Sequence, residues 1–155
     1  MAKARADSVK VHFKNTRETA MAIKGMKVER AVAYLKNVLK RKEIVPFRRF
    51  TGGVGHHAQQ KNIPGAKNGR WPVKSVRAIL ALLENATANA ANKDLKQERC
   101  FVSHIQVQRA PKTRRRTFRA HGRINAYMNS PSHIEIHLTE RSAPVPKGSS
   151  SMVRS

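Results

Sequence analysis

Positively charged side chains are concentrated between residues 109 and 123, where the sequence has seven Lys or Arg and no acidic residue. A guanidinium group binds phosphate through two parallel hydrogen bonds and also stacks on planar bases, which an ammonium group cannot do. The wider acid-free stretch, Arg99 to His133, includes Phe118 and Tyr127, whose rings could stack on bases. These features favour contacts with nucleic acid over a solvated loop. The residues expected to make them are Arg109, Lys112, Arg114, Arg115, Arg116, Arg119, His121 and Arg123.

A second stretch without acidic residues extends from Ile44 to Leu83. Its first part, residues 45–72, is rich in glycine and proline and is expected to be a long basic loop that a partner orders. The run of residues 52–55, Gly-Gly-Val-Gly, lacks the Gly-Lys-Ser/Thr of a nucleotide-binding P-loop, so it is either a flexible turn or a close approach of backbone to phosphate. The residues of this second stretch expected to bind nucleic acid are Arg48, Arg49, His56, Arg70, Trp71 and Lys74.

The histidine, cysteine and acidic residues do not indicate a metal site or a catalytic site. His133 and His137 alternate with apolar residues as in a strand, where four residues span about 13 Å, too far for two ligands of one zinc ion. The pair His56-His57 has no second pair at ligand spacing. Cys100 has no base beside it in sequence, so its expected role is that of a buried core thiol. We expect no metal, no cofactor and no enzymatic activity.

The net charge of the chain also favours nucleic acid as its partner. Thirty-two Lys and Arg residues against nine Asp and Glu residues give a formal charge of +23. A chain with this charge repels itself and favours a dense polyanion, because each phosphate contact releases condensed counterions. A membrane surface is the weaker alternative, since no long helix pairs a basic face with bulky aromatic residues. With one cysteine and no apolar segment in residues 1–10, we expect a protein of the reducing cytoplasm without a membrane span.

Hydropathy patterns predict the elements that position these residues. Residues 9–13 alternate between apolar and polar, which predicts a short strand. Asn15 and Glu18 have the spacing of a capping box at the start of a first helix. Apolar residues at intervals of three and four predict a second helix over residues 28–41 and a third from Pro72 to about residue 92.

Two further strands, around residues 101–107 and 134–138, flank the arginine-rich stretch. If they pair as one antiparallel hairpin over about residues 99–140, its tip falls near Arg116. Each side then spans roughly 60 Å at about 3.3 Å per residue, whereas a body of about 110 residues is only some 30–35 Å across. The far half must project beyond the core, and we expect it to become ordered only against phosphate.

Four stretches resemble a known family. They are VHFKNTRET at residues 11–19, VPFRR at residues 45–49 with GGVG after it, GRWP at residues 69–72, and the segments HIQV, APK, RRRT, RAHGRIN and SHIE within residues 104–135. Together they are similar to the large-subunit ribosomal proteins of universal family twenty-two, called number seventeen in eukaryotes. The resemblance covers about residues 9–141, and its fourth stretch is highly specific.

The resemblance implies an α+β fold, with three helices packed on a small antiparallel sheet and a long protruding β-hairpin. We expect one domain over residues 1–141 and a disordered tail over residues 142–155. The resemblance also implies that the body lies at the subunit surface and that the hairpin lines the nascent-peptide exit tunnel. The residues expected at the tunnel-lining tip are Arg114, Arg115, Arg116, Thr117 and Phe118.

The expected function is that of a structural constituent of the large ribosomal subunit, which binds ribosomal RNA and supports subunit assembly. Its implied partners are large-subunit ribosomal RNA, neighbouring large-subunit proteins and the nascent peptide, with no membrane. The implied location is the cytoplasmic ribosome, with nucleolar assembly in a eukaryote. The alternative is a free RNA- or DNA-binding chaperone or regulator that uses the same basic surface.

Overall fold

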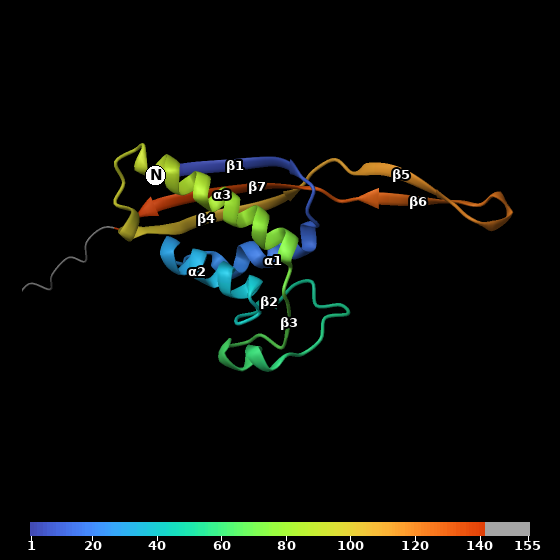
Figure 1. Ribbon diagram of the computed structural model, residues 1–155, viewed down its shortest axis with the longest axis horizontal. Coiled ribbons are helices and arrows are strands. Elements are labelled where there is room, and N and C mark those ends of the chain that lie inside the picture. The colour runs from blue at the N-terminus through green and yellow to red at the C-terminus, as the bar shows by residue number, and fades with distance from the viewer. Residues whose placement is uncertain (142–155) are drawn as a thin grey trace, which may run out of the picture.

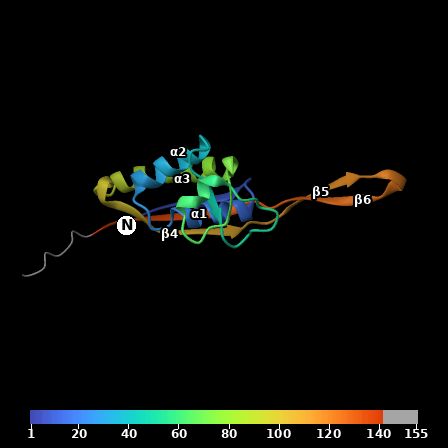
Figure 2. The same ribbon diagram turned by 90° about the horizontal axis from the view of Figure 1, so that it is seen from below.

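A three-stranded antiparallel sheet forms one layer of the structure and three helices form the other. The computed structural model describes residues 1–141. The sheet consists of β1 (Ala2–Val9), β7 (Ser132–Glu140) and β4 (Cys100–Arg109), in the order β1-β7-β4. Helices α1 (Phe13–Ile23), α2 (Val28–Leu39) and α3 (Val73–Ala91) cover one face of this sheet (Figures 1 and 2). The expected α+β class is confirmed.

Alternation along the strands brings their apolar side chains to the face that the helices cover. Ile134, Ile136 and Leu138 of β7 are buried, and each lies opposite an alanine of β1. On the other side of β7, Ile105 and Val107 of β4 lie opposite Ile136 and Ile134. The small side chains of β1 leave room for α3, which packs against that strand. Burial of this apolar surface is the main favourable term that holds the two layers together.

The second and third predicted helices are confirmed. Helix α2 ends two residues earlier than predicted, at Leu39, and α3 matches the predicted span to within one residue. Their apolar stripes supply Leu35, Ile79 and Leu83 to the core, all fully buried. Between α1 and α3, the hydroxyl groups of Thr16 and Ser75 are 3.0 Å apart and share a buried hydrogen bond.

The strand predicted over residues 9–13 is wrong. Strand β1 ends at Val9, and Phe13 begins α1. Between them the N–H of Val11 donates to the carbonyl of Val9 at 2.7 Å, which is a γ-turn. The strand over residues 2–9 escaped prediction because its inward-facing residues are alanines, which carry little strand signal.

The predicted capping box at Asn15 and Glu18 is also wrong. Helix α1 begins at Phe13, with His12 before it and no side chain capping its first turn. Asn15 therefore lies inside the helix, and the hydroxyl of Thr16 donates to the carbonyl of His12 at 2.9 Å. Glu18 is nearly fully buried, and its carboxylate bonds to a distant segment.

Part of the loop predicted over residues 45–72 has regular structure. Strands β2 (Val45–Phe47) and β3 (Asn68–Arg70) pair antiparallel, and a short 3-10 helix, η1 (Ala58–Asn62), lies between them. At Gly69 a Cβ atom would lie 2.8 Å from the carbonyl oxygen of Val45 and 2.5 Å from the side-chain nitrogen of Gln60. Only glycine lets the chain pass this close, which the composition of the segment did not predict. The tail predicted over residues 142–155 lies outside the described residues.

Candidate nucleic-acid interface

A two-stranded extension leaves one end of the sheet. Strands β4 and β7 lead into β5 (Thr113–Phe118) and β6 (Ile124–Asn129), which pair antiparallel as a separate sheet. We call residues 113–129 the distal hairpin. Two views show it projecting beyond the helices (Figures 1 and 2). The structure therefore contains the expected long hairpin, interrupted at residues 110–112 and 130–131.

The turn of the distal hairpin lies at residues 119–123, so the prediction of a tip near Arg116 is wrong. The N–H of Arg119 donates to the carbonyl of Arg123 at 2.7 Å, closing the turn. Inside it, His121 and Gly122 have φ angles of 58° and 68°, in the left-handed region that glycine adopts freely. The prediction was centred on the acid-free stretch, which ends inside β7. The register that pairs Arg109 with Ser132 places the midpoint near residue 121 instead.

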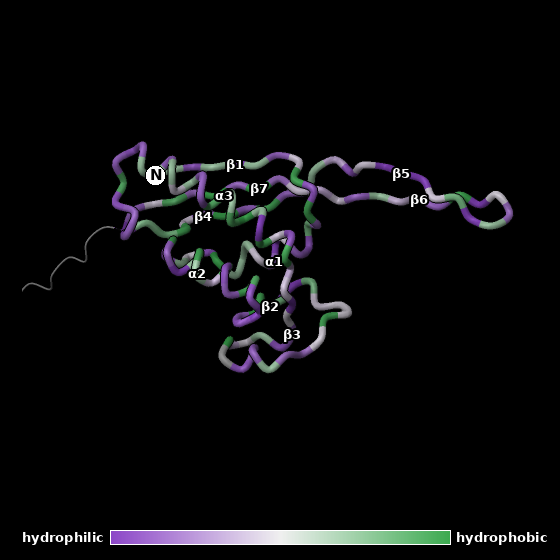
Figure 3. The backbone as a smooth tube through the Cα atoms, in the orientation of Figure 1, coloured by the Kyte–Doolittle hydropathy of each residue, from purple (hydrophilic) through white to green (hydrophobic). Residues whose placement is uncertain are grey.

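The cations of the distal hairpin point into solvent. Arg114, Arg115 and Arg116 are exposed on β5, and Arg119 and Arg123 are exposed at the turn. Among residues 1–141, no carboxylate lies within ion-pair distance of any of these five side chains. The middle of strand β5, where the arginines lie, is correspondingly hydrophilic (Figure 3). Because successive residues of a strand face opposite sides, the arginines present positive charge on both faces of the hairpin.

Aromatic rings accompany these arginines. The side chain of Phe118 is 78% exposed and that of Tyr127 is 60% exposed. The strand register places Tyr127 opposite Arg115 and Phe118 opposite Ile124. Exposed rings beside guanidinium groups are the combination that stacks on bases while holding phosphates.

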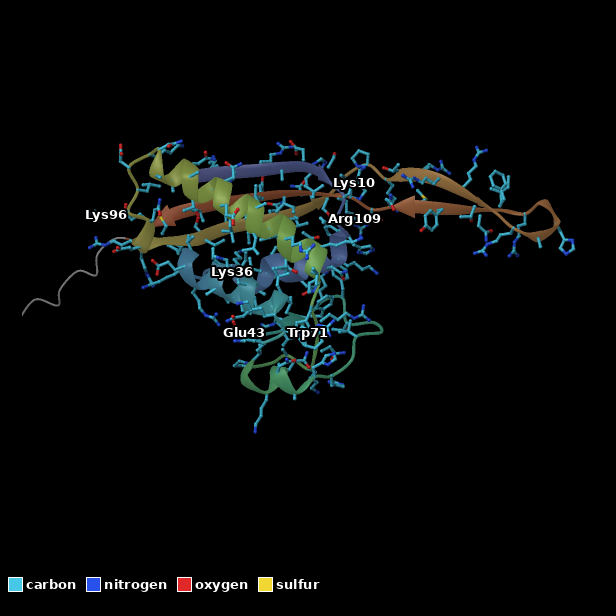
Figure 4. All side chains as sticks on the ribbon, in the orientation of Figure 1. Lys10, Lys36, Glu43, Trp71, Lys96 and Arg109 are labelled. Carbon is cyan, nitrogen blue, oxygen red and sulfur yellow. The ribbon has the colours of Figure 1, made fainter. Side chains whose placement is uncertain are left out.

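The base of the hairpin is tied to the body. The Arg109 guanidinium carbon lies 4.9 Å from the centre of the Phe13 ring, a cation–π contact with the start of α1. Figure 4 shows Lys10 and Arg109 at the end of the sheet from which the hairpin leaves. The N–H of Ala110 donates to the carbonyl of Pro131 at 3.1 Å, and Lys112 is exposed in the interruption that follows. Arg109 therefore anchors the hairpin as well as carrying charge.

A buried carboxylate organises the second basic stretch. The Glu18 oxygens accept the backbone N–H groups of Arg48 at 3.2 Å, Arg49 at 3.1 Å and Phe50 at 3.2 Å. The Arg17 guanidinium also donates to Glu18 at 3.2 Å. Three amide donors on one carboxylate hold this segment in one conformation at the body surface. Sequence patterns missed this role, because it depends on a contact across about thirty residues.

Trp71 was expected to contact nucleic acid, but in this structure its indole also holds the loop together. Its N–H donates to the carbonyl of Glu43 at 3.0 Å. The His57 ring packs edge-on against the indole, with the two ring centres 4.6 Å apart. Figure 4 shows Trp71 close to Glu43, between the helices and the loop. The Arg41 guanidinium lies 5.8 Å from the indole centre. The half-buried ring of Trp71 is therefore less available for base stacking than Phe118.

The remaining predicted residues of the loop divide into two groups. His56 bonds to the carbonyl of Lys67 at 2.5 Å, and Arg70 donates to the carbonyl of Gly53, so both side chains have structural partners. Arg48 donates to the carbonyl of Pro64 at 3.2 Å and remains exposed. Lys74 is exposed in the first turn of α3. The structure thus separates two basic surfaces, one on the distal hairpin and one around residues 48–74.

Two other histidines lie close to carboxylates. His133 and His137 lie on strand β7, as predicted, and His133 is 3.0 Å from Asp7. His104 is 3.5 Å from Glu135. Burial raises the pKa of the Cys100 thiol, in keeping with its predicted place in the core. Within residues 1–141, no three His, Cys, Asp or Glu side chains are grouped to hold a metal ion. None of the described helices combines the length and apolar character needed to cross a membrane.

The sequence of this chain is similar to those of known proteins. The sequence pattern of the family described as Ribosomal protein L22p/L17e matches residues 4–139. The large ribosomal subunit protein uL22 of Bombyx mori is 60% identical over 139 residues, which cover 90% of this chain and 74% of the relative. The protein of the same name from Dictyostelium discoideum is 59% identical over 145 residues, covering 94% of this chain and 80% of the relative. This chain therefore belongs to the L22p/L17e family of ribosomal proteins.

Proposed function

We propose that the chain binds ribosomal RNA in the large ribosomal subunit, supports assembly of that subunit and lines the nascent-peptide exit tunnel with its distal hairpin. Membership in the family makes it a structural constituent of the ribosome and not an enzyme. Its relatives are named as proteins of the large subunit. The proposed location is the cytoplasmic ribosome, after assembly in the nucleolus of a eukaryotic cell.

The observation that carries the proposal is the unpaired charge of the distal hairpin. Two strands without a third are marginal in water, and five arginines that have no carboxylate partner among residues 1–141 repel one another. A surrounding RNA resolves both problems, because its phosphates bind the guanidinium groups and its bases cover the exposed rings. The hairpin is therefore built for a crowded, anionic environment.

The body supports a second contact with RNA. Arg48 and Arg49 are presented by a backbone that Glu18 holds in place, and Lys74 is exposed on α3. With two basic surfaces on one chain, the protein can contact separate RNA segments at the same time. This is the proposed contribution to subunit assembly.

Sedimentation of cell extracts through sucrose at high salt tests the proposal. The chain should remain with large subunits, and replacing Arg114, Arg115 and Arg116 together by alanine should shift a large fraction to the top of the gradient. A matched control removes the same charge from the body, at Lys36, Lys40 and Lys96, and should shift less. A chain that leaves the subunits at high salt is a free RNA- or DNA-binding chaperone or regulator instead.

The tunnel-lining part of the proposal has its own test. A nascent chain stalled in the tunnel, carrying a photoreactive residue at successive distances from the peptidyl end, should crosslink to the turn around His121 over a narrow range of positions. Crosslinks to the body alone would contradict the placement of the hairpin in the tunnel wall.

A further inference from the structure

A groove of about 960 Å³ lies on the flank of the body, between α1, α2 and the segments 42–49 and 59–63. Its apolar lining includes Met21, Ala22, Met26 and Ile63. Met21 is 37% exposed, so part of this apolar side chain is open to solvent. The groove belongs neither to the distal hairpin nor to the sheet. Arg48 and Arg49, proposed above to contact RNA, also line it, but that contact leaves its apolar side chains without a partner.

The acidic residues in the groove are already bonded. Glu18 accepts three backbone N–H groups, as described above, and Glu43 accepts two hydrogen bonds from Arg30, at 2.5 and 3.0 Å. Asn37 donates to Glu43 as well, at 2.9 Å. In the described part of the chain, no carboxylate pairs with Lys42 or Arg49, which also line the groove. The groove therefore offers net positive charge beside apolar surface.

The chemistry of the lining favours a protein segment over RNA. Among the described residues that line the groove, Tyr34 is the one aromatic residue; it is buried, and its hydroxyl donates to the carbonyl of Ile44 at 2.8 Å. The described lining therefore offers no exposed ring for a base to stack on, in contrast to Phe118 on the distal hairpin. Methionine side chains adapt to the shape of aliphatic partners and are common in grooves that bind peptides. Charge complementarity then selects a partner with acidic residues.

We propose that this groove binds a segment of another protein in which acidic residues stand beside aliphatic ones. The aliphatic side chains pack on Met21, Met26 and Ile63, and the carboxylates pair with Lys42. Resting on the ribosomal role proposed above, the partner is a neighbouring protein of the large subunit.

Photocrosslinking in assembled large subunits tests the identity of the occupant. A benzophenone amino acid replaces Met21 in one variant and Met128 of the distal hairpin in the other, because these methionines are similarly exposed, at 37% and 43%. The Met21 probe should give an adduct that resists nuclease and is digested by protease. Mass spectrometry should place the adduct on a peptide that contains acidic and aliphatic residues. The Met128 probe should give a nuclease-sensitive adduct.

A charge reversal tests the second half of the proposal. Lys42→Glu should lower the yield of the Met21 adduct several-fold, whereas Lys40→Glu, an equal change at an exposed site outside the groove, should leave it unchanged. A nuclease-sensitive adduct at Met21, no adduct in subunits that contain the chain, or an equal yield in both lysine variants would overturn the proposal.

The two proposals fail in different ways. If the chain sediments apart from large subunits, the ribosomal role is refuted. The Met21 probe in the free chain then tests whether the groove binds a protein segment. An adduct with an acidic–aliphatic peptide that Lys42→Glu removes would then still support protein binding. The absence of such an adduct would refute it.

Discussion

The carboxylate of Glu18 lies 3.1 Å from the backbone nitrogen of Arg49, although 31 residues separate them in sequence. Through this bond and its neighbours at Arg48 and Phe50, helix α1 determines the shape of a segment that follows α2. The negative charge is almost completely shielded from solvent. One of only nine acidic residues in a strongly basic chain thus positions part of the basic surface.

Replacing this carboxylate should destabilise the protein and disorder the segment together. In Glu18→Ala the three amide donors lose their acceptor, so the free energy of unfolding should fall by at least about 1–3 kcal/mol. Urea denaturation of the purified chain measures the change. Glu84→Ala, at an exposed position of α3, should stay within about 0.5 kcal/mol of the parent. Equal stability of both variants would show that the Glu18 contacts contribute nothing.

Packing of α3 against the core should also contribute to the stability of the protein. Leu83 is fully buried, so Leu83→Ala should cost about 2–5 kcal/mol. Asn85→Ala, at an exposed position of the same helix, should be nearly neutral. Asn89 is a poor control, because its side chain donates to the carbonyl of Lys3 at 3.0 Å. Thermal unfolding distinguishes the variants, and similar melting temperatures for Leu83→Ala and Asn85→Ala would contradict the observed burial.

The ion pair between Arg30 and Glu43 should make stability depend on pH. Hydrogen bonds from Arg30 hold the pKa of Glu43 below its ordinary value of 4.5. A carboxylate with a lowered folded-state pKa stabilises the fold above its unfolded pKa, and this contribution is lost as pH falls through the folded value. Glu43→Gln should therefore lower the melting temperature at pH 7, and the difference from the parent should shrink as pH falls below about 4.5. A difference that stays constant from pH 7 to pH 3 would rule out this linkage.

Affinity for ribosomal RNA should fall steeply with salt. The slope of log affinity against log salt is expected to be several units negative, because each neutralised phosphate contributes about −0.7 to −0.9. Replacing Arg114, Arg115 and Arg116 together by alanine should reduce the slope by about 2–3 units. Filter binding with a ribosomal RNA fragment gives the slope directly. A value near about −1 for the parent chain would contradict an electrostatic mechanism.

The distal hairpin should exchange its amide hydrogens freely when the chain is alone. Its β6 side chains are all exposed, and ordering costs roughly 1–2 kcal/mol per residue that no packing offsets. Amides near Ile105 and Ile136 should remain protected in the same sample, since both residues lie in the core. Hydrogen exchange followed by mass spectrometry makes the comparison. Equal protection of hairpin and sheet without RNA would mean that the hairpin is rigid by itself.

Periodic patterns predicted the elements in which large apolar residues recur at regular spacing and are buried. Helix α3 and strand β7 were recognisable because Leu83 and Ile136 belong to regular series of large apolar residues. Strand β1 was missed because its inward positions are alanines, which are small enough to fit beneath α3 but carry little strand signal. Composition also predicted a nucleic-acid partner for the basic stretch, since net charge can be counted without knowledge of contacts.

Features that depend on distant contacts could not be predicted. The role of Glu18 requires knowing that Arg49 returns to α1, and its spacing to Asn15 suggested a local cap instead. The turn at His121 follows from the register of β4 against β7, which no single segment specifies. The groove beside Met21 is formed by four segments from different parts of the chain.

The position of β7 at the centre of the sheet constrains the order of folding during synthesis. Strand β1 is the first strand of the described residues to be synthesised, and among them it pairs only with β7, the last. At about 5–20 residues per second, β1 waits roughly 6–25 s for its partner. Throughout that interval the helices have no complete sheet to cover. This strongly basic chain must therefore remain soluble among abundant polyanions before its fold can close.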